Sequence, residues 1–189
     1  YYRNEATPFV FRAVNRLDRD TSGLVLLAKN PYSSCVLSDA VKDHTIHREY
    51  AAIVSGKTDA SGTIDLPIAR KDGSTIERVC DPERGETAVT HYRTFAYNKD
   101  ADISFIRLLL ETGRTHQIRV HMKAIGHPLP GDFLYCPDYR FIDRQPLHST
   151  YLIFSHPMTG EKLEFSASLP EDMRKLFPDI KNPSGPVFF

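Results

Sequence analysis

Short strand-like segments follow one another through most of this 189-residue chain, and turns rather than long helices join several of them. Residues 88–97 alternate larger apolar side chains with polar ones, as a half-buried strand does. Strands outnumber helices, which favours an α+β fold: a mixed, largely antiparallel sheet flanked by a few helices, not a regular βαβ array. The expected strands are 24–29 (buried), 47–55, 88–97, 103–110, 147–155 and 162–167, with two or three shorter ones within 57–85.

Three helices are expected. Asn30 and Pro31 form a cap and first helical position for residues 31–43. Ile118, Met122 and Ile125 make one apolar stripe on a second helix that Gly126 ends, with His116, Arg119 and Lys123 on its other side. Residues 170–177 carry acidic side chains at the start and basic ones at the end, which matches a helix dipole.

Length and composition fit one soluble domain over residues 1–189, since 41% of residues are apolar and 25% charged. No apolar run approaches the ~20 residues that span a bilayer, and no signal peptide is recognisable. Three widely spaced cysteines argue against a disulfide framework or zinc ribbon and suit the cytoplasm. We therefore expect a cytoplasmic monomer without membrane contact.

Charge is balanced overall, with 24 basic and 24 acidic residues, which counts mildly against nucleic-acid binding. The balance conceals a basic stretch at residues 107–127, where Glu111 is the only acidic residue. Free backbone N–H groups at a helix start there, with Arg114, Arg119 and Lys123 close in sequence, would favour a phosphate.

Three segments carry candidate chemistry, and each has a structural alternative. Asp18 in the run RLDRDTSG (residues 16–23) is either a salt-bridged turn carboxylate or a nucleophile. Tyr50 is either a core tyrosine of a strand or a site residue. The run TGRTHQIR (residues 112–119) is either a solvated helix face or an anion site. His116 and His121 are poorly spaced for metal ligands, so no metal site is expected.

Taken together, these segments resemble the RluA-type family of RNA pseudouridine synthases. The ordered resemblance covers about residues 12–170, and this order makes it specific. The matching segments are 16–23, 48–56, 113–122, 126–132, 134–135, 144–148, 154–157 and 159–161.

The resemblance implies isomerisation of uridine to pseudouridine in ribosomal or transfer RNA, without cofactor or metal. It places the family's aspartate nucleophile on Asp18, its stacking tyrosine on Tyr50 and the aspartate's basic partner on Arg114. We accordingly expect Asp18 to face a cleft, with Arg114 within salt-bridge reach and Tyr50 lining the same pocket. The expected substrate and RNA contacts are Arg16, Arg19, Thr21, His116, Gln117, Ile118 (as a pocket wall), Arg119 and Lys123, with Arg12 as a further phosphate contact.

The chain also departs from the family pattern. Asn15 stands where the family commonly has His, and Pro130 replaces an aliphatic residue. Only 17 residues precede Asp18, so we expect a catalytic domain lacking its N-terminal core segment and any S4-like RNA-binding domain. Two other functions stay open: an RNA-binding module that has lost turnover, and an unrelated hydrolase using Asp18 and Asp20.

Overall fold

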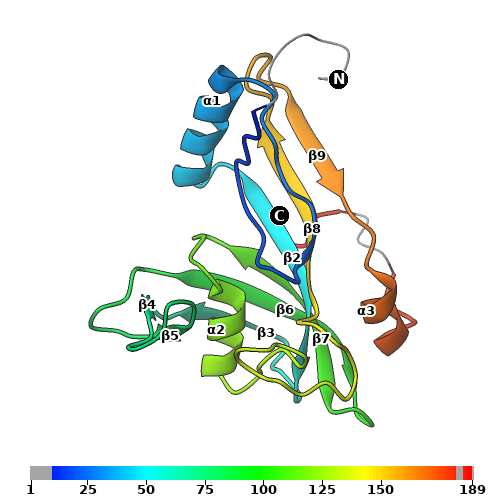
Figure 1. Ribbon diagram of the computed structural model, residues 1–189. Coiled ribbons are helices and arrows are strands. Elements are labelled where there is room, and N and C mark those ends of the chain that lie inside the picture. Colours follow the sequence, from blue (N-terminus) through cyan, green and yellow to red (C-terminus); the bar gives the residue numbers. More distant parts are fainter. Residues whose placement is uncertain (1–9, 182–184, 189) are drawn as a thin grey trace.

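A seven-stranded sheet forms the centre of the molecule (Figure 1). The computed structural model describes residues 10–181 and 185–188. Strand order is β1-β8-β2-β7-β6-β3, and β9 pairs with β8 beyond the end of β1. Among the strand pairs of the described residues only β1–β8 is parallel, so the expected mixed, largely antiparallel α+β architecture is confirmed. The strands are β1 Ser22–Gly23, β2 His47–Ser55, β3 Ser61–Asp65, β4 Ile68–Arg70, β5 Arg78–Cys80, β6 Val89–Asn98, β7 Ile103–Leu110, β8 Leu147–Ser155 and β9 Lys162–Ser166.

In the described part of the chain three helices accompany the sheet: α1 (Pro31–Lys42), α2 (Gln117–Ala124) and α3 (Glu171–Leu176). The Asn30 side chain accepts a hydrogen bond from the Ser33 amide at 2.8 Å, so α1 begins with the expected cap. None of the helices within the described residues has the length and apolar character needed to cross a membrane.

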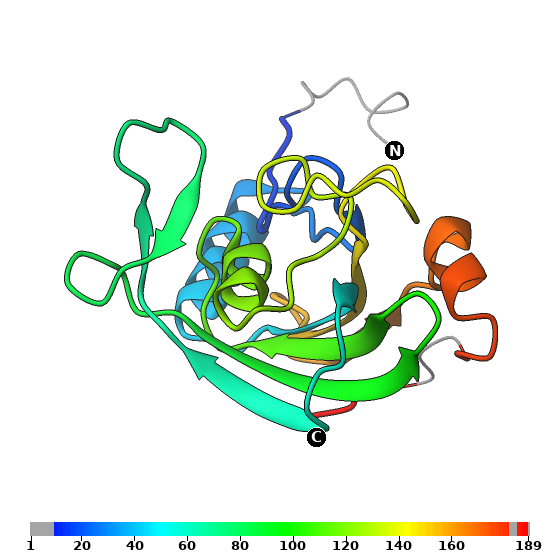
Figure 2. The same cartoon turned by 90° about the horizontal axis from the view of Figure 1, so that it is seen from below.

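The central strand β2 is buried on both faces because α2 and α3 cover opposite sides of the sheet. Tyr50, Ala52 and Val54 pack in one cluster with Ile118 and Met122 of α2. The alternate residues of β2 face a second cluster that includes Met173 of α3. Figure 2 shows the sheet curving around α2, while the β4–β5 hairpin projects to one side. Tyr50 therefore points to the α2 side.

The predicted strand over residues 24–29 is wrong. Its backbone bonds go to several partners: the Leu24 amide donates to Ser149 O, and the Leu26 amide donates to the Asn15 side chain. Leu27 forms only an isolated bridge with Ala13, and it is 48% exposed. Without one neighbouring strand to pair along its length, the segment forms no continuous ladder.

Candidate active site

A cleft of about 660 Å³ opens where the turn before β1, the strand β2 and the start of α2 meet. Asp18, Tyr50 and Arg114 all line it. Arg16, Thr21, His116, Gln117 and Ile118 line it as well. Arg19, Arg119 and Lys123 do not belong to the lining, although Arg119 lies directly behind Asp18.

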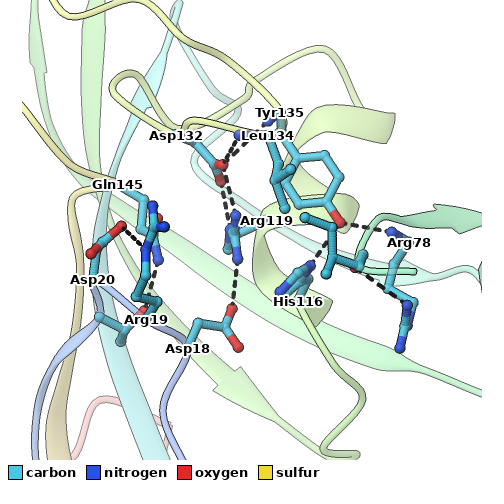
Figure 3. A network of polar contacts seen from close by, with 12 residues as sticks. Asp18, Arg19, Asp20, Arg78, His116, Arg119, Asp132, Leu134, Tyr135 and Gln145 are labelled. Carbon is cyan, nitrogen blue, oxygen red and sulfur yellow. Dashed lines mark hydrogen bonds and ion pairs between the residues drawn. The ribbon is translucent and has the colours of Figure 1, made fainter. Parts of the chain in front are cut away.

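Asp18 forms an ion pair with Arg119, whose Nη1 lies 3.1 Å from Asp18 Oδ2 (Figure 3). The other side of the same guanidinium binds Asp132 through Nε at 2.6 Å and Nη2 at 2.8 Å. Arg119 is 2% exposed and Asp132 is fully buried. Burial opposes the charge of Arg119, but the two carboxylates outweigh this effect and raise its pKa. The bidentate bond fixes the guanidinium and leaves one nitrogen to orient Asp18.

Asp132 is itself held by the chain that follows it. Its Oδ1 accepts hydrogen bonds from the amides of Leu134 and Tyr135 at 3.0 and 3.2 Å. The Tyr135 ring lies against Arg119, with 4.9 Å between the ring centroid and Cζ. Arg119 is thus enclosed by a carboxylate, an aromatic face and Asp18, and has little freedom to turn.

The expected pairing of Asp18 with Arg114 is wrong. The Arg114 Nη1 lies 2.5 Å from Glu86 Oε2, and its Nε donates to Thr87 O at 3.0 Å. The side chain is 39% exposed and leads away toward the loop before β6. Arg114 therefore contributes positive charge at the cleft rim, and Arg119 takes the place beside Asp18.

The expected place of Arg119, on the side of the helix opposite the apolar stripe, is also wrong, because Arg119 is buried. With 3.6 residues per turn, Arg119 lies only about 60° from Met122 on the helix circumference, next to the apolar stripe rather than opposite it. A guanidinium at that flank can be buried because two carboxylates satisfy it.

Tyr50 lines the cleft, belongs to the core cluster beneath it and is only 6% exposed. Burial raises the pKa of its phenol, the positive charge of Arg48 lowers it and the negative charge of Asp18 raises it. The net pKa is above its ordinary value, so the hydroxyl keeps its proton at neutral pH. A rigid aromatic face beside a carboxylate is suited to stacking a planar base.

The turn before α2 is built by the Gln117 side chain. Gln117 Oε1 accepts from the Thr112 hydroxyl at 2.8 Å and from the Arg114 amide at 2.9 Å. Its Nε2 donates to Val89 O at 2.9 Å. These contacts use the donor and acceptor atoms of the side-chain amide, so Gln117 stabilises the turn that lines the cleft.

His116 begins α2 in a left-handed conformation, with φ of 59°. Tyr135 Oη accepts a hydrogen bond from the Arg78 amide at 2.8 Å and lies 2.9 Å from His116 Nδ1 (Figure 3). Burial raises the pKa of Tyr135 to about 12. Burial, and then the charge of Arg119, lower the pKa of His116. Both shifts favour the neutral forms, so at neutral pH the contact joins a protonated tyrosine hydroxyl to an uncharged imidazole.

The other expected RNA contacts lie near the surface. Arg19 is exposed, pairs with Asp20 at 3.0 Å and stacks over Phe133 at 4.0 Å. Lys123 is exposed beside the Tyr135 ring. A hydrolase that uses Asp18 and Asp20 would need both carboxylates in one pocket. Asp20 instead pairs with Arg19 and does not line the cleft that contains Asp18.

Two residues near the site carry no predicted role. Asp132 follows Gly131, but nothing in its local pattern indicates a buried ion pair. Arg48 lines the cleft, and its position two residues before Tyr50 in a predicted strand would have placed it on the same face. Asn15, the departure from the family's His, accepts a hydrogen bond from the Leu26 amide and so fixes the turn that carries Asp18.

No set of three His, Cys, Asp or Glu side chains within the described part of the chain comes together as a metal site. Cys35, Cys80 and Cys136 are free thiols.

Comparisons with known proteins agree with the resemblance. The sequence model described as RNA pseudouridylate synthase matches residues 1–124. The Uncharacterized RNA pseudouridine synthase YjbO of Bacillus subtilis (strain 168) is 47% identical over 177 residues, which cover 93% of this chain and 62% of that protein. Ribosomal large subunit pseudouridine synthase D of Zymomonas mobilis is 42% identical, over 87% of this chain and 54% of that protein.

A solved structure has a similar fold. Human RNA Pseudouridylate Synthase Domain Containing 1 superposes with a TM-score of 0.73 at 27% identity, covering 84% of this chain and 69% of that one. This chain spans 54–62% of the length of the two bacterial relatives.

Proposed function

Because this chain belongs to the RNA pseudouridylate synthase family, we propose that it forms the catalytic domain of an enzyme that isomerises uridine to pseudouridine in RNA. One observation carries the proposal: Asp18 and Tyr50 line one cleft, and Arg119, locked by Asp132, orients the Asp18 carboxylate. A cleft of about 660 Å³ lies in the size range of small-molecule and nucleoside sites.

The proposed reaction starts from a uridine that has left its helical stack, because a stacked base cannot reach the floor of the cleft. Tyr50 would stack on the uracil, and Ile118 would close the pocket beside it. Asp18 would attack either C6 of the base or C1′ of the ribose and form a covalent intermediate. The N1–C1′ bond breaks and a C5–C1′ bond forms, while C5 loses a proton and N1 gains one. The bond to Asp18 breaks again, which restores the free carboxylate and releases pseudouridine. The balance needs no cofactor or metal.

The proposed substrate is ribosomal RNA or transfer RNA. Ribosomal RNA is favoured because a relative at 42% identity carries the name ribosomal large subunit pseudouridine synthase D. The basic side chains around the cleft, Arg16 and Arg114 among them, would contact phosphates and position the RNA without reading its sequence. Three free thiols agree with a proposed location in the cytoplasm.

Tritium release from RNA containing 5-tritiated uridine tests the proposal. We expect Asp18→Asn to lower the rate at least about 1000-fold, because it removes the nucleophile. Asp20→Asn is the matched control, since this neighbouring aspartate lies outside the cleft, and its rate should stay within about threefold of the native protein. Equal rates for the native protein and Asp18→Asn would contradict the assignment. RNA binding by a native protein that forms no pseudouridine would support the binding-module alternative.

A further inference from the structure

The proposed reaction leaves one charged group of the cleft without a task. Arg48 lies on β2, two residues before Tyr50, so both side chains point to the α2 side of the sheet. It lines the same cleft as Asp18 and Tyr50. Its charge is close enough to the Tyr50 hydroxyl to influence it.

Arg48 has no counter-ion within the described residues. Its side chain forms no ion pair or hydrogen bond there, and its Nε is buried without a partner. Of the described side chains that line the cleft, Asp18 is the only acidic one, and Arg119 already pairs with it. A partly buried guanidinium whose donors stay unused is costly unless an anion binds to it.

The guanidinium is held in a defined place. A Cβ atom built on Gly113 would lie 3.3 Å from Arg48 Nη2, so the group rests directly against the turn before α2. Gly113 does not need a positive φ, and its missing side chain instead leaves room for the guanidinium.

Other basic side chains line the same cleft. Arg16 lines it from the Asp18 turn, and Lys42 lines it from the end of α1, where it also pairs with Asp39 at 2.8 Å. The chain has zero net charge, whereas the described lining of the cleft carries Arg16, Lys42, Arg48 and Arg114 against one acidic residue, Asp18. An elongated anion that continues from the cleft to the surface would match it.

We propose that Arg48 binds a backbone phosphate of the nucleotide whose base stacks on Tyr50, and that Arg16 and Lys42 contact the RNA strand where it leaves the cleft. The inference rests on the proposed function for the identity of the base. Because the base and the phosphate of one nucleotide are then bound within the same cleft, Arg48 fixes the position of the sugar relative to Asp18.

Binding of small probes tests the phosphate contact without catalysis. Uridine, uridine 3′-monophosphate and uridine 5′-monophosphate are titrated into the native protein by NMR. We expect one monophosphate to bind about tenfold more tightly than uridine, as a charge-assisted hydrogen bond contributes. Arg48→Met should reduce this preference to less than about twofold, and Arg48→Lys should keep part of it. Arg174→Met on α3 is the charge-matched control and should keep all of it.

The proposal is overturned if neither monophosphate binds more tightly than uridine, or if Arg48→Met keeps the preference. Urea unfolding of Arg48→Met verifies its fold, which should be as stable as the native one because no bond is lost. In the tritium assay Arg48→Met should raise KM more than it lowers kcat.

The two proposals fail in different ways. A native protein that forms no pseudouridine but shows the Arg48-dependent preference contradicts the reaction alone. Normal tritium release with no phosphate preference contradicts the role of Arg48 alone.

Discussion

At the scale of single residues, Arg119 decides how the candidate site is built. Its guanidinium is buried between Asp132 and Asp18 and lies against the Tyr135 ring. Burying such a charge is expensive, so the pair contributes orientation more than stability. Removing the arginine alone would leave the Asp132 carboxylate buried without its counter-ion.

Arg119→Met should therefore lower the free energy of unfolding by about 3–5 kcal/mol. Arg114→Met is the matched control, and it should cost at most about 1 kcal/mol because its pair with Glu86 is exposed. Urea denaturation of both variants checks the difference. Asp132→Asn added to Arg119→Met should recover part of the loss, since it removes the unpaired charge. Similar losses for the two single variants would contradict the assignment of Arg119 as the buried partner.

At the scale of elements, the two-residue strand β1 fixes the turn that carries Asp18. Gly23 has φ of +109° and pairs in parallel with Ser149 of β8. A Cβ on Gly23 would lie 2.2 Å from Ser149 O, a contact that backbone atoms cannot relieve without moving apart. The approach of β1 to β8 thus requires glycine for two reasons, the backbone angle and the space.

Gly23→Ala should separate β1 from β8, lower the free energy of unfolding by at least about 2 kcal/mol and reduce tritium release. Gly73→Ala is a matched control, because Gly73 also has a positive φ but has open space around its Cα. Gly73→Ala should lower the free energy of unfolding only by the backbone strain, about 1 kcal/mol, and leave the rate of tritium release unchanged. The idea fails if the two variants unfold at the same urea concentration.

At the scale of the whole molecule, buried histidines link stability to pH. Burial lowers the pKa of His116, His121 and His148 in the folded protein. His121 is fully buried: Nε2 donates to Leu66 O, and Nδ1 lies 2.9 Å from the Thr90 hydroxyl. These contacts suit the neutral ring, with its proton on Nε2.

The unfolded chain, with histidine pKa values near 6.5, therefore binds more protons than the folded protein below about pH 7. Stability should be full above that pH and fall as pH drops through 6.5 toward the lower folded values. The slope is up to about 1.4 kcal/mol per pH unit for each histidine. Urea unfolding between pH 7.5 and 5.5 measures it. His121→Gln should reduce the dependence of the free energy of unfolding on pH, whereas substitution of the exposed His44 by Gln should not. An unchanged slope in His121→Gln would contradict the role of this buried histidine.

The sequence by itself determined most elements and the identity of the candidate nucleophile. Strands β2, β7 and β8 begin and end at the predicted residues, because alternation and turn residues act locally. The ordered motifs were sufficient to predict that Asp18 and Tyr50 lie in one cleft.

Only the tertiary structure decided which arginine faces Asp18. Asp18 and Arg119 are 101 positions apart, and their pairing depends on Asp132 and on how α2 packs against the sheet. The same holds for residues 24–29, whose backbone amides bond to several partners instead of one strand. It also holds for Arg48, whose charge has no counter-ion among the described residues. Local patterns encode backbone conformation, whereas ion pairs and burial arise from distant segments that meet in space.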